Sequence, residues 1–406
     1  MGFLKQTLKG VGWMGSLRGI SRVISLGKTV ALARLLTPAE FGVFGIVVLT
    51  LALLEIFTET GVNAVLIQLK EKIEDFVDTA WVVSIIRGIL IAFLMIISAP
   101  FLAKFFTAPA AVSLLILAAI IPFIRGFINP AIVSFQKELK FQKEFILRSI
   151  TLLTDLIVSL VLVLLFRSVA GLIWGITASA LMEVLFSFLW LPTKPGLKFE
   201  KEKFLTILSF GKWVTLSGIF SYLADRIDDI FVGRVLGVAS LGIYQMAFKI
   251  SNLSFTEITN VTSKVTFPVY SKIGGDKQRL KRAYLRTLSA IVLPSLFISS
   301  LLFLFPHQLI KIFLGSRWLG AAAPLRILAL FGLIRATGSS AAPLFLSVGK
   351  PKLMAKITGI KFLILSLLLV PLSLKFQLIG TSLAVLFSSL SIQPIVWINV
   401  IKILKK

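Results

Sequence analysis

The sequence lacks cysteine altogether and has a single histidine, His307, among its 406 residues. These absences exclude a disulfide framework, a thiolate metal site, a cysteine nucleophile and a histidine-rich metal site. Acidic residues are also scarce, because 18 aspartates and glutamates stand against 43 lysines and arginines, which gives a net charge of +25. The sequence therefore predicts no metal centre and no cofactor.

Long polar segments are missing as well. Apolar residues make up 57% of the chain and its mean hydropathy is +0.96. A soluble domain of this composition would expose more apolar surface than water tolerates. Hydrophobic runs of about 20 to 28 residues can cross about 30 Å of hydrocarbon as helices, and they are too long for barrel strands. The sequence therefore predicts an all-α membrane protein with twelve transmembrane helices.

The expected spans are residues 11–35, 41–68, 76–104, 109–136, 145–167, 169–191, 210–234, 240–268, 284–305, 319–347, 353–374 and 377–402.

The basic residues outside the expected spans lie mostly on the side that holds both termini. Twenty-four lysines and arginines are on that side and seven are on the other. The positive-inside rule then puts both termini in the cytoplasm and the protein in the cytoplasmic membrane. This orientation and attraction to anionic lipid headgroups explain the net charge, and no basic soluble domain exists that could bind nucleic acid.

The two halves of the chain resemble each other weakly at a shift of 200 residues. This shift places Trp13 on Trp213 and Arg34 on Arg234. Six spans per half is an even number, so both halves enter the membrane in the same direction. We expect two six-helix bundles, residues 1–195 and 196–406, related by a pseudo-twofold axis along the membrane normal.

The turn after the first expected span reads Thr37-Pro38-Ala39-Glu40. Threonine caps helices, proline fits the first helical position, and a glutamate at the third position can reach back to the amide of the capping residue. These residues predict the start of a helix rather than a catalytic site.

Arginines inside the expected spans are the strongest functional signal. Arg18 and Arg22 lie four residues apart, and Arg87, Arg125 and Arg335 each lie three or four residues from a serine or an asparagine. A charge inside hydrocarbon costs several kcal/mol unless it is paired or hydrated. Arginine keeps its proton and presents a planar fork that suits phosphate oxygens.

Two interpretations of these arginines stay open. They form a cationic chamber for an anionic headgroup whose apolar tail remains in lipid, or they pair with acids and hold helices together. We favour the chamber for Arg18, Arg22, Arg87, Arg125 and Arg335, and pairing for Arg226 beside Asp225. The acids available for pairing are Glu55, Glu59, Asp155, Glu183, Asp225, Asp228 and Asp229.

Several motifs give the chain a family resemblance. The second half contains DRIDDIFVGRVLG at residues 225–237 and LGIYQMA at 241–247, and the first half contains ARLLTPAEFG at 33–42. Shorter matches are FPVYS at 267–271, FLGSRW at 313–318 and VGKP at 348–351. In this order the motifs resemble the polysaccharide transporter family. That family includes Wzx-type oligosaccharide flippases and colanic and teichuronic acid exporters, within the multidrug/oligosaccharidyl-lipid/polysaccharide superfamily.

The resemblance implies a flippase and not an enzyme. Such a protein moves an undecaprenyl-diphosphate-linked oligosaccharide from the cytoplasmic to the outer leaflet by alternating access, for cell-surface polysaccharide or lipopolysaccharide biosynthesis. Its partners are the anionic lipid-linked oligosaccharide, membrane lipids, H+ or Na+, and glycosyltransferases or a polymerase of the same pathway. The hypothesis assigns the diphosphate to Arg18, Arg22, Arg87, Arg125, Arg226 and Arg335. It assigns ion coupling to Asp155, Glu183, Asp225 and Asp228.

Two other functions compete with this hypothesis. A multidrug exporter of the same superfamily takes cations and is expected to line its cavity with acids and aromatic residues. A membrane glycosyltransferase or polymerase is expected to carry a sizeable outer loop with catalytic groups. The longest expected outer connection, residues 306–318, holds no carboxylate. The arginines inside the expected spans do not fit a cavity built for cations, and the outer connection without a carboxylate does not fit a catalytic loop. Both observations favour the flippase.

Overall fold

The structure, a computed structural model, describes residues 3–68, 73–138, 140–273 and 276–405. Within these ranges it leaves out the side chains of residues 3–18, 64, 68, 210–214, 217, 253–265, 268 and 351. The described chain consists of helices and their connections and contains no β-strand. The predicted all-α class is therefore confirmed.

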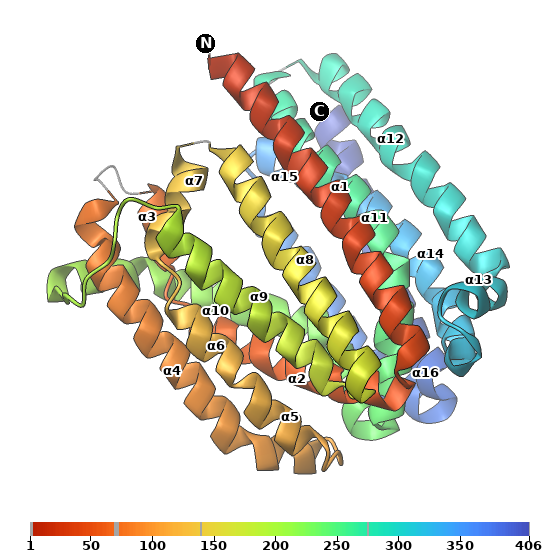
Figure 1. Cartoon of the computed structure of the whole chain (residues 1–406). Helices are drawn as coiled ribbons and strands as arrows, with labels where there is room; N and C mark the ends of the chain where they lie inside the picture. The colour runs from red at the N-terminus through yellow and green to blue at the C-terminus, as the bar shows by residue number, and fades with distance from the viewer. Residues whose placement is uncertain (1–2, 69–72, 139, 274–275, 406) are drawn as a thin grey trace. The chain divides into compact units, whose positions relative to one another are not determined.

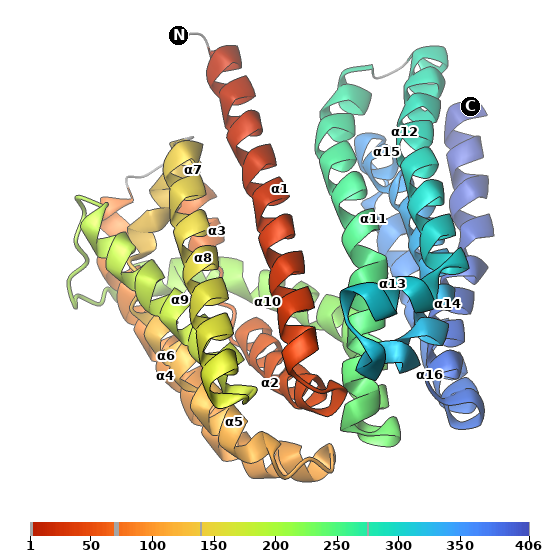
Figure 2. The same ribbon diagram turned by 45° about the vertical axis from the view of Figure 1, so that its right-hand side comes forward.

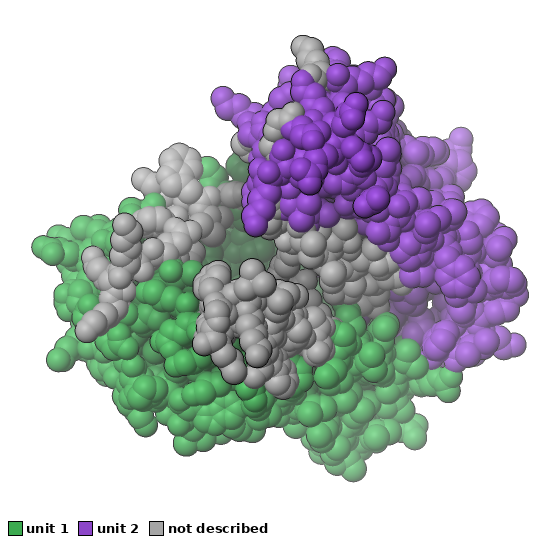
Figure 3. Space-filling model, turned by 90° about the horizontal axis from the view of Figure 1, so that it is seen from above, with its two compact units in different colours: residues 1–225 green, residues 226–406 purple. Residues whose placement is uncertain are grey.

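The chain divides into two compact units, unit 1 at Met1–Asp225 and unit 2 at Arg226–Lys406 (Figure 3). Unit 1 thus includes residues 196–225, which the sequence assigned to the second bundle. The start of this segment is held by unit 1, because the Gly196 N–H donates to Asp78 Oδ1 at 2.7 Å. The predicted boundary between two helix bundles at residues 195 and 196 stays a prediction.

Unit 1 contains nine α-helices, most of a tenth and one 3-10 turn among its described residues (Figures 1 and 2). They are α1 (Phe3–Leu35), α2 (Pro38–Phe57), α3 (Val62–Gln68), α4 (Glu74–Phe105), α5 (Ala111–Ala118), α6 (Ile120–Gly126), η1 (Pro130–Val133), α7 (Ser134–Lys137), α8 (Phe141–Phe166), α9 (Ala170–Leu189) and α10 (Lys201–Phe231).

The start of α2 follows the local sequence. Thr37 has an extended backbone and its side chain accepts a hydrogen bond from the Glu40 N–H at 3.3 Å. The Glu40 carboxylate in turn accepts the Thr37 N–H at 2.7 Å. Pro38 occupies the first turn. The predicted helix start is confirmed, because each of these contacts needs only neighbouring residues.

Glycines let the helices of unit 1 approach closely. A Cβ atom at Gly88 of α4 would lie 2.5 Å from the Pro122 carbonyl oxygen of α6. A Cβ atom at Gly175 of α9 would lie 1.9 Å from Ser159 Oγ of α8, and Gly171 lies one turn earlier on the same face. This small-xxx-small spacing allows backbone contact where lipid provides no hydrophobic driving force between helices.

Unit 2 begins with the end of α10, and its other described elements follow in chain order (Figures 1 and 2). They are η2 (Val232–Leu236), α11 (Val238–Ile273), α12 (Lys277–Leu304), α13 (Pro306–Phe313), η3 (Ser316–Ala321), α14 (Ala322–Ser339), α15 (Ala341–Ser347) and α16 (Pro351–Lys405).

A hydrophobic cluster ties together the ends of four helices in unit 2. Tyr270 of α11, Tyr284 of α12, Phe345 of α15 and both Ile357 and Val400 of α16 are buried in it. Two residues far apart on α16 reach one cluster because the helix path breaks inside this element.

The break in α16 lies at Gln377, whose φ of 51° and ψ of −130° are not helical. It falls where the sequence separates the last two expected spans.

The described residues include seven helical segments that are long and apolar enough to cross a membrane. An eighth is added if the pair Ala111–Gly126 and Pro130–Lys137, bent by 72°, counts as one broken span. The chain is therefore a multi-span membrane protein. Because some segments join two expected spans, as residues 352–405 do, the total of twelve stays a prediction.

Candidate functional site

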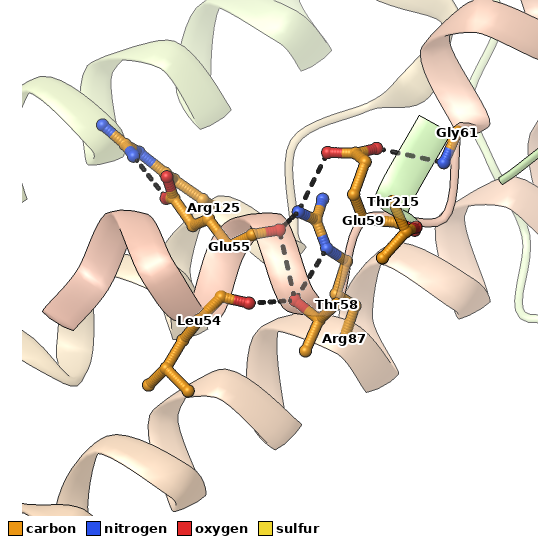
Figure 4. Close-up of polar contacts among 8 residues, drawn as sticks. All are labelled: Leu54, Glu55, Thr58, Glu59, Gly61, Arg87, Arg125 and Thr215. Atoms are coloured by element: carbon orange, nitrogen blue, oxygen red, sulfur yellow. Dashed lines mark hydrogen bonds and ion pairs between the residues drawn. The ribbon is translucent and has the colours of Figure 1, made fainter. Parts of the chain in front are cut away.

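The C-terminal end of α2 in unit 1 carries a connected polar cluster (Figure 4). Carbonyl groups in the last turn of a helix lack partners within the helix and carry partial negative charge. Arg87 of α4 meets this end, because its Nη2 donates to the Glu55 carbonyl oxygen at 2.6 Å. Its Nε donates to Thr58 Oγ1 at 3.3 Å, and that hydroxyl donates to the Leu54 carbonyl oxygen at 2.7 Å. The guanidinium group of Arg87 thus caps the C-terminal end of α2.

Two carboxylates complete the cluster. Arg87 Nη2 lies 3.1 Å from Glu59 Oε2, and Arg125 Nη1 of α6 lies 2.8 Å from Glu55 Oε1. The other Glu59 oxygen accepts the N–H of Gly61, a residue with a positive φ of 71°. Figure 4 shows both arginines reaching the same end of α2. The internal pairing that the sequence left open is found for Arg87 and Arg125.

These ion pairs stay partly accessible to solvent or ligand. The side chains of Arg125 and Glu55 are 39% and 33% exposed, and those of Arg87 and Glu59 are 26% and 35% exposed. The formal charges of the four groups cancel. A second anion can therefore reach the guanidinium groups, but it has to compete with the two carboxylates.

Helix α10 contacts α2 and the residues that follow it through two hydroxyl groups. Thr215 Oγ1 donates to the Glu59 carbonyl oxygen at 2.5 Å, and Tyr222 Oη donates to the Leu49 carbonyl oxygen at 2.7 Å. The two donors are seven residues apart, which puts them on one face of α10. The sequence did not predict this contact, because a hydroxyl spacing does not indicate which backbone it meets.

A second polar cluster joins α1 to α8. Lys28 Nζ lies 2.6 Å from Asp155 Oδ1, and both side chains are largely buried, at 16% and 22% exposure. Ser159 Oγ donates to the same carboxylate oxygen at 3.2 Å. The sequence patterns did not single out Lys28, although a lysine inside an expected span is a signal of a buried or paired charge. Nearer the start of α8, Arg148 Nη1 pairs with Glu183 Oε1 of α9 at 2.9 Å.

Unit 2 holds a third polar cluster where the end of α10 meets α11. Asp228 and Asp229 are 5% and 3% exposed. Tyr244 Oη donates to Asp228 Oδ2 at 2.6 Å, and Arg226 Nη1 lies 3.0 Å from Asp229 Oδ2. Asp225 is exposed. The expected pairing of Arg226 with an acid is therefore found, with Asp229 as the partner one turn along the helix.

Arg335 of α14 has a different environment. Its Nη1 donates to Asn252 Oδ1 at 3.1 Å, and its guanidinium carbon lies 6.0 Å from the centre of the Phe331 ring. Lys361 Nζ lies 5.4 Å from the centre of the same ring. Among the described residues, Arg335 forms no ion pair with an acid. An amide oxygen and an aromatic face contact its guanidinium group without neutralising the charge.

The six arginines named from the sequence fall into separate surroundings. Arg87 and Arg125 come together on α2, whereas Arg226 and Arg335 have partners within unit 2. Arg22 is half-buried on α1, and the side chain of Arg18 lies outside the described residues. A common binding role for the six stays a prediction.

Comparison with known proteins identifies the family. The sequence family described as "Polysaccharide biosynthesis protein" matches residues 31–323. The chain belongs to this family. The match covers more than half of the chain, and the family resemblance predicted from the motifs is confirmed.

Curated relatives cover most of the chain. The Escherichia coli lipopolysaccharide biosynthesis protein WzxC is 22% identical over 367 residues, covering 89% of this chain and 74% of its own. The Bacillus subtilis teichuronic acid biosynthesis protein TuaB is 24% identical over 354 residues, covering 86% and 73%. A Klebsiella pneumoniae membrane protein from a cps region is 24% identical over 367 residues, covering 88% and 75%.

Solved structures share the fold. The lipid II flippase MurJ in an inward closed conformation matches with a TM-score of 0.79 at 17% identity, covering 96% of this chain and 89% of its own. An inward-facing MATE-family multidrug resistance transporter of the MOP superfamily matches with a TM-score of 0.74 at 17% identity, covering 97% and 99%. At this identity the likeness shows that the chain has the fold of MOP-superfamily transporters.

Proposed function

We propose that the protein is a flippase that moves an undecaprenyl-diphosphate-linked oligosaccharide from the cytoplasmic to the outer leaflet by alternating access. The observation that carries the proposal is family membership over residues 31–323. Relatives named for lipopolysaccharide and teichuronic acid biosynthesis support export of a surface polysaccharide. The fold shared with a lipid flippase supports movement of a lipid-linked substrate.

The proposed architecture is the one expected from the sequence. Twelve spans form two six-helix bundles in the cytoplasmic membrane, with both termini in the cytoplasm. The excess of basic residues on one side supports this orientation. The break at Gln377 supports two spans within α16.

The cluster at the end of α2 supplies the proposed phosphate contacts in unit 1. A diphosphate presents the same kind of oxygen pair as the carboxylates of Glu55 and Glu59, so it can take their place at the forks of Arg87 and Arg125. The carboxylates neutralise the arginines when no substrate is present, which lowers the cost of charges inside the membrane. Exchange of one anion for another therefore leaves no arginine unpaired.

In unit 2 we propose Arg335 and Arg226 as the corresponding contacts. Arg335 supports this role because an amide oxygen and a ring face hold it in place without neutralising it. Arg18 and Arg22 on α1 complete the proposed set.

The membrane potential supplies a driving force. A potential of 100 mV is worth about 2.3 kcal/mol for each charge that crosses, and an anionic headgroup that leaves a negative interior moves downhill. Ion coupling is proposed for Asp155, Glu183, Asp225 and Asp228, with H+ or Na+ as the ion. Of these, Asp155 has its charge balanced by Lys28, which makes it the acid whose partner changes if α1 moves.

The role is proposed as transport without catalysis, so glycosyltransferases or a polymerase of the same pathway act before and after it. The multidrug alternative is less well supported, because the matching family model and the curated relatives are named for polysaccharide biosynthesis, whereas multidrug transporters match this chain by fold. The arginines also favour an anionic substrate over a cationic drug.

Reconstitution tests the proposal. Proteoliposomes containing the full chain receive a fluorescent polyprenyl-diphosphate oligosaccharide in one leaflet, and its appearance in the other leaflet is measured with a membrane-impermeant quencher. We expect protein-dependent translocation that drops in the Arg18→Ala/Arg22→Ala variant. Translocation no faster than in protein-free vesicles, combined with uptake of a cationic dye, would establish the multidrug alternative.

A further inference from the structure

One end of unit 2 carries basic side chains that take no part in the proposed phosphate contacts. On α12 these are Lys277, Arg279, Lys281, Arg282 and Arg286, all exposed. On α16 they are Lys352 and Lys356 near its start and Lys402 and Lys405 near its end, also exposed. We call these nine residues the basic end of unit 2.

The hydrophobic cluster of unit 2 brings these residues to one place. Leu280 and Tyr284 of α12 pack in the same cluster as Ile357 and Val400 of α16. The basic residues lie between and beside these buried positions along both helices. Figure 2 shows the C-terminus of α16 beside the start of α12, in agreement with the cluster.

The basic end has almost no acid to balance it. Asp276 is the nearby acidic residue of the described chain, and its carboxylate accepts the Arg279 N–H at 2.9 Å as a helix cap. Within the ranges that the structure describes, none of the nine side chains forms an ion pair. The positive charge of this end is therefore presented outward.

The comparable end of unit 1 is built differently. The start of α8 and the loop before α10 carry lysines together with acids, and the start of α4 adds Glu74 and Asp75. Lys140 pairs with Glu138, and Lys203 pairs with Glu200 at 2.7 Å. The positive-inside rule counts lysines and arginines and gives little weight to acids, so this mixed end already satisfies it. Orientation in the membrane therefore does not explain why the basic end of unit 2 has almost no acids.

Helix α12 continues the basic end into an apolar, exposed stripe. Arg282 and Arg286 share a helix face with Leu293 and Phe297, which are 66% and 73% exposed. The separation of Arg286 from Leu293 along the axis is about 10 Å, because a helix rises about 1.5 Å per residue. A charged group above an apolar stripe at this distance matches a phospholipid headgroup above its acyl chain. A soluble acidic protein would match the charge but not the stripe.

On α16, a tryptophan indicates where the basic end lies relative to the membrane–water interface. Trp397 of α16 is partly buried against the same cluster, and tryptophan is enriched at the membrane–water interface. Lys402 and Lys405 follow it by roughly 8 to 12 Å along the helix. This places them at headgroup level if Trp397 marks the interface.

We propose that the basic end of unit 2 is a binding surface for anionic phospholipid headgroups of the leaflet that it faces. Its ligands are phosphodiester lipids with a net negative charge, such as phosphatidylglycerol. Several lipids bind side by side, each with its headgroup at the lysines and arginines and an acyl chain along α12. This surface is independent of the proposed transport substrate.

Native mass spectrometry of the full chain in detergent tests the proposal. Phosphatidylglycerol and phosphatidylcholine with the same acyl chains are titrated separately, and the dissociation constants for the first bound lipids are compared. We expect phosphatidylglycerol to bind about tenfold more tightly, and raising the salt concentration to reduce this preference.

Three variants test which basic residues cause the preference for phosphatidylglycerol. The first carries Arg279→Gln, Lys281→Gln, Arg282→Gln and Arg286→Gln. The second carries Lys352→Gln, Lys356→Gln, Lys402→Gln and Lys405→Gln. The control removes four exposed charges from unit 1 with Lys140→Gln, Lys143→Gln, Lys194→Gln and Lys198→Gln.

We expect the preference for phosphatidylglycerol to fall to about twofold or less in the first two variants and to stay near tenfold in the control. Using two helices keeps the test informative if one variant fails to fold, which its gel-filtration profile shows. An equal loss in the control would overturn the proposal, because net charge alone would then explain binding. An unchanged preference in both unit 2 variants would also overturn it and would favour an acidic protein partner.

Discussion

Neutral variants of the ion pair between Glu55 and Arg125 can show whether Arg125 binds the substrate or only holds two helices together. The perturbation is a pair of neutral variants, Glu55→Gln and Arg125→Gln. If the pair only locks α2 to α6, removing either partner costs the same interaction and has the same effect on function. If Arg125 receives the substrate's phosphates, the two variants differ in the sign of their effect on anion binding.

The structure sets the size of the effect. The two charged atoms are 2.8 Å apart, but the side chains are 39% and 33% exposed, so solvent screens their attraction. A pair of this kind contributes about 1 kcal/mol rather than the much larger value of a dry interior. Both variants should therefore lower the free energy of unfolding by a similar amount of about 1 kcal/mol. Removing the competing carboxylate should raise the affinity of Arg125 for a phosphate by about fivefold.

Calorimetric titration with inorganic pyrophosphate measures this difference in the purified full chain. We expect tighter binding in Glu55→Gln and weaker binding in Arg125→Gln, with similar thermal unfolding of the two variants. Weaker binding of pyrophosphate in both variants, or no change in either, would refute the reasoning and leave the pair as a structural lock.

Two further predictions concern stability, measured by thermal unfolding in detergent. Lys28→Met leaves the largely buried Asp155 carboxylate without its cation and should lower the free energy of unfolding by about 3 kcal/mol. Adding Asp155→Asn should restore much of this loss. An unchanged stability in the single variant would contradict the prediction. Gly175→Ala places a methyl group 1.9 Å from Ser159 Oγ and should destabilise the protein by about 1 to 3 kcal/mol. Gly27→Ala on α1 meets nothing within 4 Å and should be neutral or stabilising, so a larger loss in this control would contradict the packing argument.

Local features of the fold could be predicted from the sequence, because they depend on neighbours. The helix start at Thr37 is confirmed, since its cap and its partner Glu40 are three residues apart. The all-α class and the membrane setting follow from composition and run length alone. The family follows from motifs that extend along the chain.

The pairing within the site could not be predicted, because it depends on which helices meet. Lys28 and Asp155 are 127 residues apart, and no spacing rule connects them. The sequence also could not decide between pairing and binding for Arg87. That choice depends on the distance to Glu59 and on how much of both groups remains exposed, which are properties of the folded helices.

The most direct test of the central claim is the translocation rate of a labelled polyprenyl-diphosphate oligosaccharide in proteoliposomes of the Arg87→Gln/Arg125→Gln variant. Its control is Arg167→Gln/Arg326→Gln, which removes the same charge from two exposed side chains outside the cluster. The account predicts a rate at least about tenfold lower in the first variant and a near-native rate in the control, because two charge-assisted phosphate contacts are lost. Equal rates in both variants and the native protein would contradict it.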